Sequence, residues 1–195
     1  MECLFLGGNN MDATNVTAGK PNTGGAVYRA PLSSSLTLPS STATDMSTLT
    51  AFKELGYVSD AGVVNSNNPS SNDIKAWGGN NVLNTQTDKP DTFKFTLLEV
   101  LKIDVLKAVY GSDNVTEDSS THEITVKANA DEGEYGAWVI DMIMRGGKAK
   151  RVVIPNAKIA NIEDITYSDT AAVGYGITLS CMPDSAGNTH YEYIL

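Results

Sequence analysis

Alternation between apolar and small polar side chains constrains this chain more than any other feature of its sequence. It is clearest in VGYGITLSCMP, residues Val173–Pro183. The apolar positions are Val173, Tyr175, Ile177, Leu179 and Cys181, and the residues between them are Gly174, Gly176, Thr178 and Ser180. A period of two places each set on one face of a β-strand. The segment is therefore predicted to be a strand, and none of its side chains is suited to catalysis.

Similar short segments, separated by turn residues, recur from Leu55 to the end of the chain. Two hairpins are predicted, one over 56–64 with its turn at 60–62, and one that joins Ile74–Trp77 to Val82–Gln86. Further strands are expected over 92–99, 124–128, 138–144, 150–154, 159–167 (with a bulge) and 190–194. The pattern is typical of an all-β core.

One short helix is also predicted. Asp104 can cap it, Val105–Tyr110 gives about two turns, and Gly111 can end it. Two turns are not stable alone, so the helix must pack on a sheet. The predicted fold class is mainly β (α+β): a β-sandwich or barrel-like fold with one short helix near residues 104–110.

The chain divides into three predicted parts. Residues 1–10 are interpreted as a non-native leader, because two glycines there can be encoded by a bacterial ribosome-binding sequence upstream of Met11; the same letters GGNN recur inside the chain, so a chance match stays open. Residues 11–54 are an N-terminal arm, in which 11 of the 18 residues over 33–50 are Ser or Thr. The arm is either a disordered tail or a segment that orders against a neighbouring subunit. Residues 55–195 form the β domain.

Composition narrows the class of partner. The formal net charge is −9. Tight non-specific binding to nucleic acid depends on Lys and Arg that neutralise phosphates, so this charge argues against it, and against docking on anionic lipid. No apolar run approaches the roughly 18 to 20 residues of a membrane helix, so we expect a soluble protein.

Two cysteines do not make a disulfide scaffold, and Cys181 is expected to be a buried thiol.

The sequence offers no constellation for chemistry. Its two histidines, His122 and His190, lie in no metal-ligand spacing with Cys or carboxylates. Both are interpreted as non-catalytic, and His122 is expected to be a solvated loop residue. Motifs for hydrolases, metalloproteases and phosphate-binding loops are absent from the sequence. We therefore predict no catalytic residue, no cofactor and no metal, and a protein that is not an enzyme.

Charge is unevenly distributed. From Asp113 to Glu134 the chain has seven acids and one base, and from Arg145 to Arg151 it has four bases and no acid. This is either ordinary surface charge or the basis of head-to-tail association, in which the acidic region of one copy meets the basic hairpin of the next.

Several segments resemble the major tail proteins of long, non-contractile (siphovirus-like) bacteriophage tails. They are KAWGG at 75–79, TDKPDTFKFTLLEVLKIDVLKAVYG at 87–111, RVVIPNAKIANIEDITYSD at 151–169, AVGYGITLSCMPD at 172–184 and GNTHYEYI at 187–194. The resemblance runs from about Lys20 to the end of the chain. It covers neither the first ten residues nor, with certainty, the Ser/Thr-rich segment.

The resemblance implies a structural virion protein of the tail, assembled in the host bacterial cytoplasm. In that family hexameric rings stack into a tube, and the tape measure protein and the DNA pass through its bore. Tail terminator and distal tail proteins are the further partners implied, with no membrane. The candidates for ring-to-ring contact are Lys148, Lys150, Arg151, Asp131, Glu132 and Glu134. The alternative is a monomeric β-sandwich adhesion or decoration module on a virion or cell surface.

Overall fold

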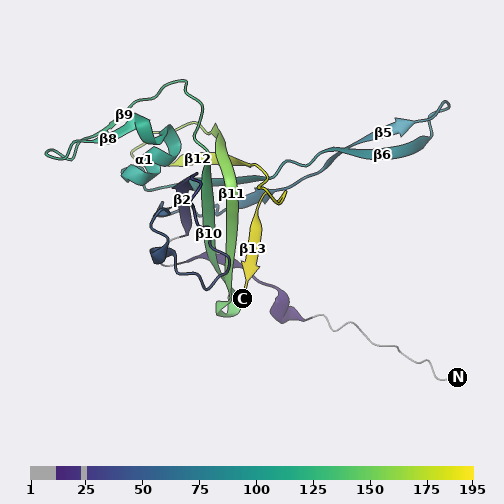
Figure 1. The fold of residues 1–195 in the computed structure, drawn as a ribbon, viewed down its shortest axis with the longest axis horizontal. Helices are drawn as coiled ribbons and strands as arrows, with labels where there is room; N and C mark the ends of the chain where they lie inside the picture. The colour runs from purple at the N-terminus through teal and green to yellow at the C-terminus, as the bar shows by residue number, and fades with distance from the viewer. Residues whose placement is uncertain (1–11, 23–25) are drawn as a thin grey trace.

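The computed structural model describes residues 12–22 and 26–195 (Figure 1), so the predicted leader at 1–10 and Met11 lie outside the described residues. The strands are β1 (Gly19–Pro21), β2 (Val27–Pro31), β3 (Lys53–Glu54), β4 (Val64–Ser66), β5 (Ser70–Lys75), β6 (Asn81–Asp88), β7 (Thr92–Leu97), β8 (Val115–Glu117), β9 (Ile124–Val126), β10 (Gly136–Met144), β11 (Ala149–Ile162), β12 (Tyr175–Cys181) and β13 (Tyr191–Ile194). The α-helix is α1 (Ile103–Tyr110), and the short 3-10 turns are η1 (Ala13–Asn15), η2 (Met46–Thr48), η3 (Ser112–Asn114) and η4 (Arg145–Gly147). The fold is mainly β with one short α-helix in the described residues, as predicted.

Antiparallel pairing joins nine strands into one sheet. Its order is β3-β2-β10-β11-β12-β7-β4, with β1 beside the far end of β10 and β13 beside the first half of β11. Two small hairpins, β5–β6 and β8–β9, form separate two-stranded sheets. The long β10–β11 hairpin is the centre of the large sheet (Figure 1).

The sheet curls around its core. In a flat sheet β10 and β7 would be about 14 Å apart, because β11 and β12 lie between them and neighbouring strands are about 4.8 Å apart. Yet the rings of Trp138 on β10 and Phe95 on β7 are in edge-to-face contact, with centroids 6.1 Å apart. The two strands therefore face each other across the core, which gives the sheet its barrel-like shape.

Alternation along the strands decides which side chains enter this core. Tyr175, Ile177 and Leu179 on β12 are all buried in it, which confirms the period-two pattern of the C-terminal strand. Cys181 is buried at the end of the same row, as predicted. The row on β7 that pairs with it is Phe93, Phe95 and Leu97.

A second core covers the opposite face of β10 and β11. Trp138 and Ile140 point into the first core, whereas Ala137 and Val139 point into the second. Met46, Phe52 and several partly buried leucines of the N-terminal region pack over the second core. Both faces of the central hairpin are therefore buried, and Asp141 on the second face is buried together with its partner Arg151.

The helix is present but begins differently from the prediction. Its first residue is Ile103 and Lys102 is the N-cap, which makes no side-chain hydrogen bond. Asp104 lies inside the first turn, so its predicted role as the N-cap is wrong. Its negative charge still interacts favourably with the positive end of the helix dipole. Gly111 ends the helix at φ 93°, a conformation that favours glycine.

One predicted hairpin is confirmed and the other is wrong. β5 and β6 pair from Ser70↔Asp88 to Lys75↔Asn81, with glycines at the turn. Residues 56–64 do not fold back on themselves, because Val58 and β4 both pair with β7. Residues 60–62 instead form a turn that separates Val58 from β4 along the edge of the sheet formed beside β7. The predicted bulge is confirmed between Ile159 and Asn161, inside β11.

The region predicted to be an arm contributes to the sheet. β2 pairs with β10 over five residue pairs, and β3 pairs with β2. Residues 36–52 lie over the second core. Order against a neighbouring subunit, one of the two alternatives given for residues 11–54, stays a prediction.

Two adjacent residues on β12 test the alternation. Leu179→Ala should lower the free energy of unfolding by about 2–5 kcal/mol, because Leu179 is fully buried and its truncation leaves a cavity. Ser180→Ala, on the opposite face, should change it by about 0.5 kcal/mol or less. Urea denaturation measures both. Equal losses would contradict the assignment of faces.

Candidate functional site

The acidic candidates lie in the loop that leads into β10. Asp131 and Glu132 are exposed, and Glu132 forms an ion pair with Lys158 while keeping 72% of its side chain exposed. Glu134 differs, since it accepts hydrogen bonds from Arg29 Nη2 (3.1 Å) and from the backbone N–H of Ser112 (2.6 Å). Burial alone would raise the pKa of Glu134, but these hydrogen bonds outweigh it and the pKa is lowered. Glu134 thus holds the loop in place.

The basic candidates lie at the turn between β10 and β11 and just beyond it. Lys148 is exposed in the turn. Lys150 is mostly buried and pairs with Glu192 of β13 at 2.8 Å. Lys20 on β1 and Arg145 add exposed positive charge nearby; sequence spacing could not reveal Lys20, which reaches this end only through pairing of β1 with β10.

Arg151 is an internal residue. It is 5% exposed, and its Nε and Nη2 donate to the two carboxylate oxygens of Asp141 at 2.6 and 2.7 Å. Its Nη1 donates to the backbone carbonyls of Ser41 and Thr44 at 2.9 and 2.8 Å. Because the guanidinium already makes these four hydrogen bonds, few of its N–H donors are free to bind another subunit. Arg151 therefore ties the Ser/Thr-rich segment to the sheet.

The structure does not bring the acidic and basic candidates together within one chain. They lie at opposite ends of β10, whose nine residues span about 27 Å. Figure 1 shows the β10–β11 turn at one end of the molecule, and α1 with the β8–β9 hairpin at the other. The exposed candidate charges are thus separated along β10, with Asp131 and Glu132 at one end (the acidic end) and Lys148, near Lys20 and Arg145, at the other (the basic end).

The β5–β6 hairpin is the most exposed element. Figure 1 shows it projecting far from the body, and every residue of both strands is exposed. Its outer half carries four exposed apolar side chains: Ile74, Trp77, Val82 and Leu83. A lone two-stranded hairpin is at best marginally stable in water. An exposed apolar tip on such a hairpin indicates a partner surface.

A buried carboxylate fixes the root of this hairpin. The side chain of Asp91, 1% exposed, accepts hydrogen bonds from Asn65 Nδ2 (2.8 Å) and Thr189 Oγ1 (2.6 Å) and contacts His190 Nδ1 at 2.5 Å. Burial would raise the pKa of Asp91, but the bonds from Thr189, His190 and Asn65 outweigh it and the pKa is lowered. Through these contacts Asp91, which directly precedes β7, connects β4 to the residues just before β13 at the base of the β5–β6 hairpin.

His190 is mostly buried, with 17% of its side chain exposed, and only the fold reveals its acidic partner Asp91. His122 is a solvated loop residue, as predicted, and contacts Glu117. Among residues 12–22 and 26–195 no three His, Cys, Asp or Glu side chains are grouped so as to hold a metal ion. Over the same residues, no helix has the length and apolar character to cross a bilayer.

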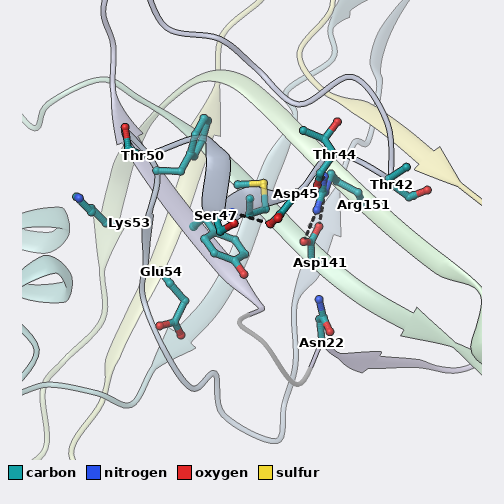
Figure 2. A pocket seen from close by; sticks show the side chains of 14 residues that line it. Asn22, Thr42, Thr44, Asp45, Ser47, Thr50, Lys53, Glu54, Asp141 and Arg151 are labelled. Carbon is teal, nitrogen blue, oxygen red and sulfur yellow. Dashed lines mark hydrogen bonds and ion pairs between the residues drawn. The ribbon is translucent and has the colours of Figure 1, made fainter.

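A cavity of about 730 Å³ lies beside the second core (Figure 2). Its apolar lining comes from Tyr28, Met46 and Phe52. Charged groups surround it: Asp45, Lys53 and Glu54 at the mouth, and the Asp141–Arg151 pair on one wall, which Figure 2 shows joined by dashed lines. Asp45 also caps η2 by accepting from Ser47 N–H (2.9 Å). The cavity thus combines an apolar lining with charged groups from the N-terminal region and from the β10–β11 hairpin.

Comparison with known proteins agrees with these observations. The sequence model of the family described as phage tail tube protein matches residues 8–195. A search of curated proteins finds no match. A match over nearly the whole chain, on a mainly β fold with an exposed hairpin and oppositely charged ends, shows that the chain belongs to the phage tail tube protein family and is a structural protein of the virion tail.

Proposed function

We propose that this protein polymerises as stacked hexameric rings into the tail tube, and that DNA passes through the bore during ejection. The separation of exposed charge to the two ends of β10 carries the proposal, because identical copies stacked head to tail then place acid against base at every step. The tape measure protein occupies the bore before ejection. Tail terminator and distal tail proteins close the two ends, and assembly takes place in the host bacterial cytoplasm.

In this proposal, the ring-to-ring contact joins Lys148 to Asp131 and Glu132 of the next ring, and Lys150 is left out because its ammonium group already pairs with Glu192. Lys148 has no ion pair within the described chain, and the two acids keep most of their surface in solvent. Arg151 and Glu134 are not included, since their hydrogen bonds are already made inside the subunit.

Sheet edges support association within a ring. The edge strands β3 and β4 have only two and three residues, and the β5–β6 hairpin has both outer edges unpaired. Unpaired edges are templates for pairing with another chain. Completion of these edges by neighbouring copies would make one continuous wall around the bore.

Net charge suits the transit of DNA. Each chain carries −9, so a hexameric ring is strongly acidic. A lumen with this sign of charge repels phosphates, whereas a basic lining would bind them. DNA therefore moves through without being held.

Electron microscopy tests assembly directly. Concentrated protein, or protein added to purified tail initiation complexes, should form rings with sixfold symmetry and hollow tubes. Antibodies against this chain should label the tail shaft of virions along its full length. Shafts that lack this chain, or that carry it as isolated external knobs, would favour the monomeric adhesion or decoration module instead.

Charge reversal separates stacking from folding. Lys148→Glu should shorten or abolish tubes while changing the unfolding free energy of the monomer by about 0.5 kcal/mol or less, because Lys148 is exposed. Arg151→Ala should cost about 3–5 kcal/mol of stability, since it leaves the carboxylate of Asp141 buried without a partner. Tube length and monomer denaturation measure the two effects. Tubes of normal length from Lys148→Glu would refute the proposed contact.

A further inference from the structure

The tip of the β5–β6 hairpin and the cavity beside the second core have complementary chemistry. The tip presents Trp77, fully exposed, and Lys75, which makes no ion pair in the described residues. The cavity has an apolar floor of Tyr28, Met46 and Phe52. Two acids, Asp45 and Glu54, and one base, Lys53, lie at its mouth, so the net charge there is negative and opposite to that of Lys75. A volume of about 730 Å³ is ample for an indole and its neighbours.

The cavity is held open by specific contacts. Its wall is the segment 41–54, which begins at the two carbonyls bound by Arg151 and continues through η2, capped by Asp45. Met46 and Phe52 anchor the same segment in the second core. The wall is therefore fixed before any partner arrives, which lowers the cost of ordering on binding.

Geometry directs the tip to another molecule. In Figure 1 the hairpin leaves one side of the body, and the N-terminal region that forms the cavity wall lies on the other side. Asp91 and its partners hold the hairpin root, so the tip is presented away from its own cavity. A contact between two different surfaces of identical chains is heterologous, and it repeats from copy to copy.

We infer that the cavity of one subunit is the socket for the hairpin tip of a second copy of this chain. Trp77 packs against Tyr28, Met46 and Phe52 of the neighbour, and Lys75 faces its Asp45. The inference rests on the proposed self-assembly and adds to it the surface that receives the hairpin. It also gives the Ser/Thr-rich segment a use, as the wall of an intersubunit socket.

Trp77 reports on its own burial. The chain has two tryptophans, and Trp138 is already buried, so a Trp138→Phe background isolates the fluorescence of Trp77. Acrylamide should quench Trp77 readily in the monomer and several-fold less in assembled tubes, with a blue shift of its emission. Quenching that is equal in monomer and tube would overturn the inference while leaving tube formation intact.

Cysteine cross-linking identifies the socket. Asn80→Cys at the tip, combined with Thr50→Cys in the cavity wall, should give a ladder of covalent multimers on oxidation of assembled protein. The matched control combines Asn80→Cys with Thr116→Cys, an exposed residue of the β8–β9 hairpin, and should give no ladder. Native Cys181 is buried, and Cys3→Ser is introduced into both pairs so that the other native cysteine cannot cross-link.

A charge exchange covers the case in which the cysteine variants do not assemble. Lys75→Glu and Asp45→Lys should each reduce tube yield at least several-fold, and the double variant should recover most of it. Recovery supports the socket. Tubes that form normally with either single variant, or a ladder from the control pair equal to that from Thr50→Cys, would place the tip elsewhere. Wild-type protein that never forms tubes would instead count against the proposed function.

Discussion

Burial of the β10–β11 hairpin on both faces is the constraint on which the rest of this structure depends. One face packs Trp138 and Ile140 into the curled sheet, and the other packs Val139 under the N-terminal region. A slip of β10 by one residue would move Asp141 away from Arg151 and into the first core, where its carboxylate would have no partner. The same hairpin sets the distance between the acidic loop and the basic turn. The separation of charge is thus fixed by packing rather than by flexible surface side chains.

The sequence predicted the elements better than their partners. Alternation identified β7, β10 and β12, because a period of two reports directly on faces. It could not reveal that residues 56–64 pair with β7 instead of with themselves, since two short apolar runs around a glycine turn look the same in both cases. Nor could the polar composition of residues 33–50 show that Met46 and a few leucines suffice to dock the segment on a sheet.

The candidate site shows the same limit for charge. Lys148 and Arg151 are three residues apart in one basic run, yet the first is exposed and the second is sealed against Asp141. Glu132 and Glu134 differ in the same way. Formal charge is additive along a sequence, but availability depends on partners that are distant in the chain, here residues 29, 41, 44 and 141. The resemblance to tail proteins predicted the family, whereas only the fold separates exposed charges from internal ones.

Arg151 has one more consequence, for how this protein can diverge. It holds residues 41 and 44 through their carbonyl oxygens, which every amino acid possesses. Side chains along that segment can therefore be exchanged while the backbone keeps its course. Sequence change between residues 41 and 44 therefore costs little stability, whereas the buried side chains of Met46 and Phe52 do not share this freedom.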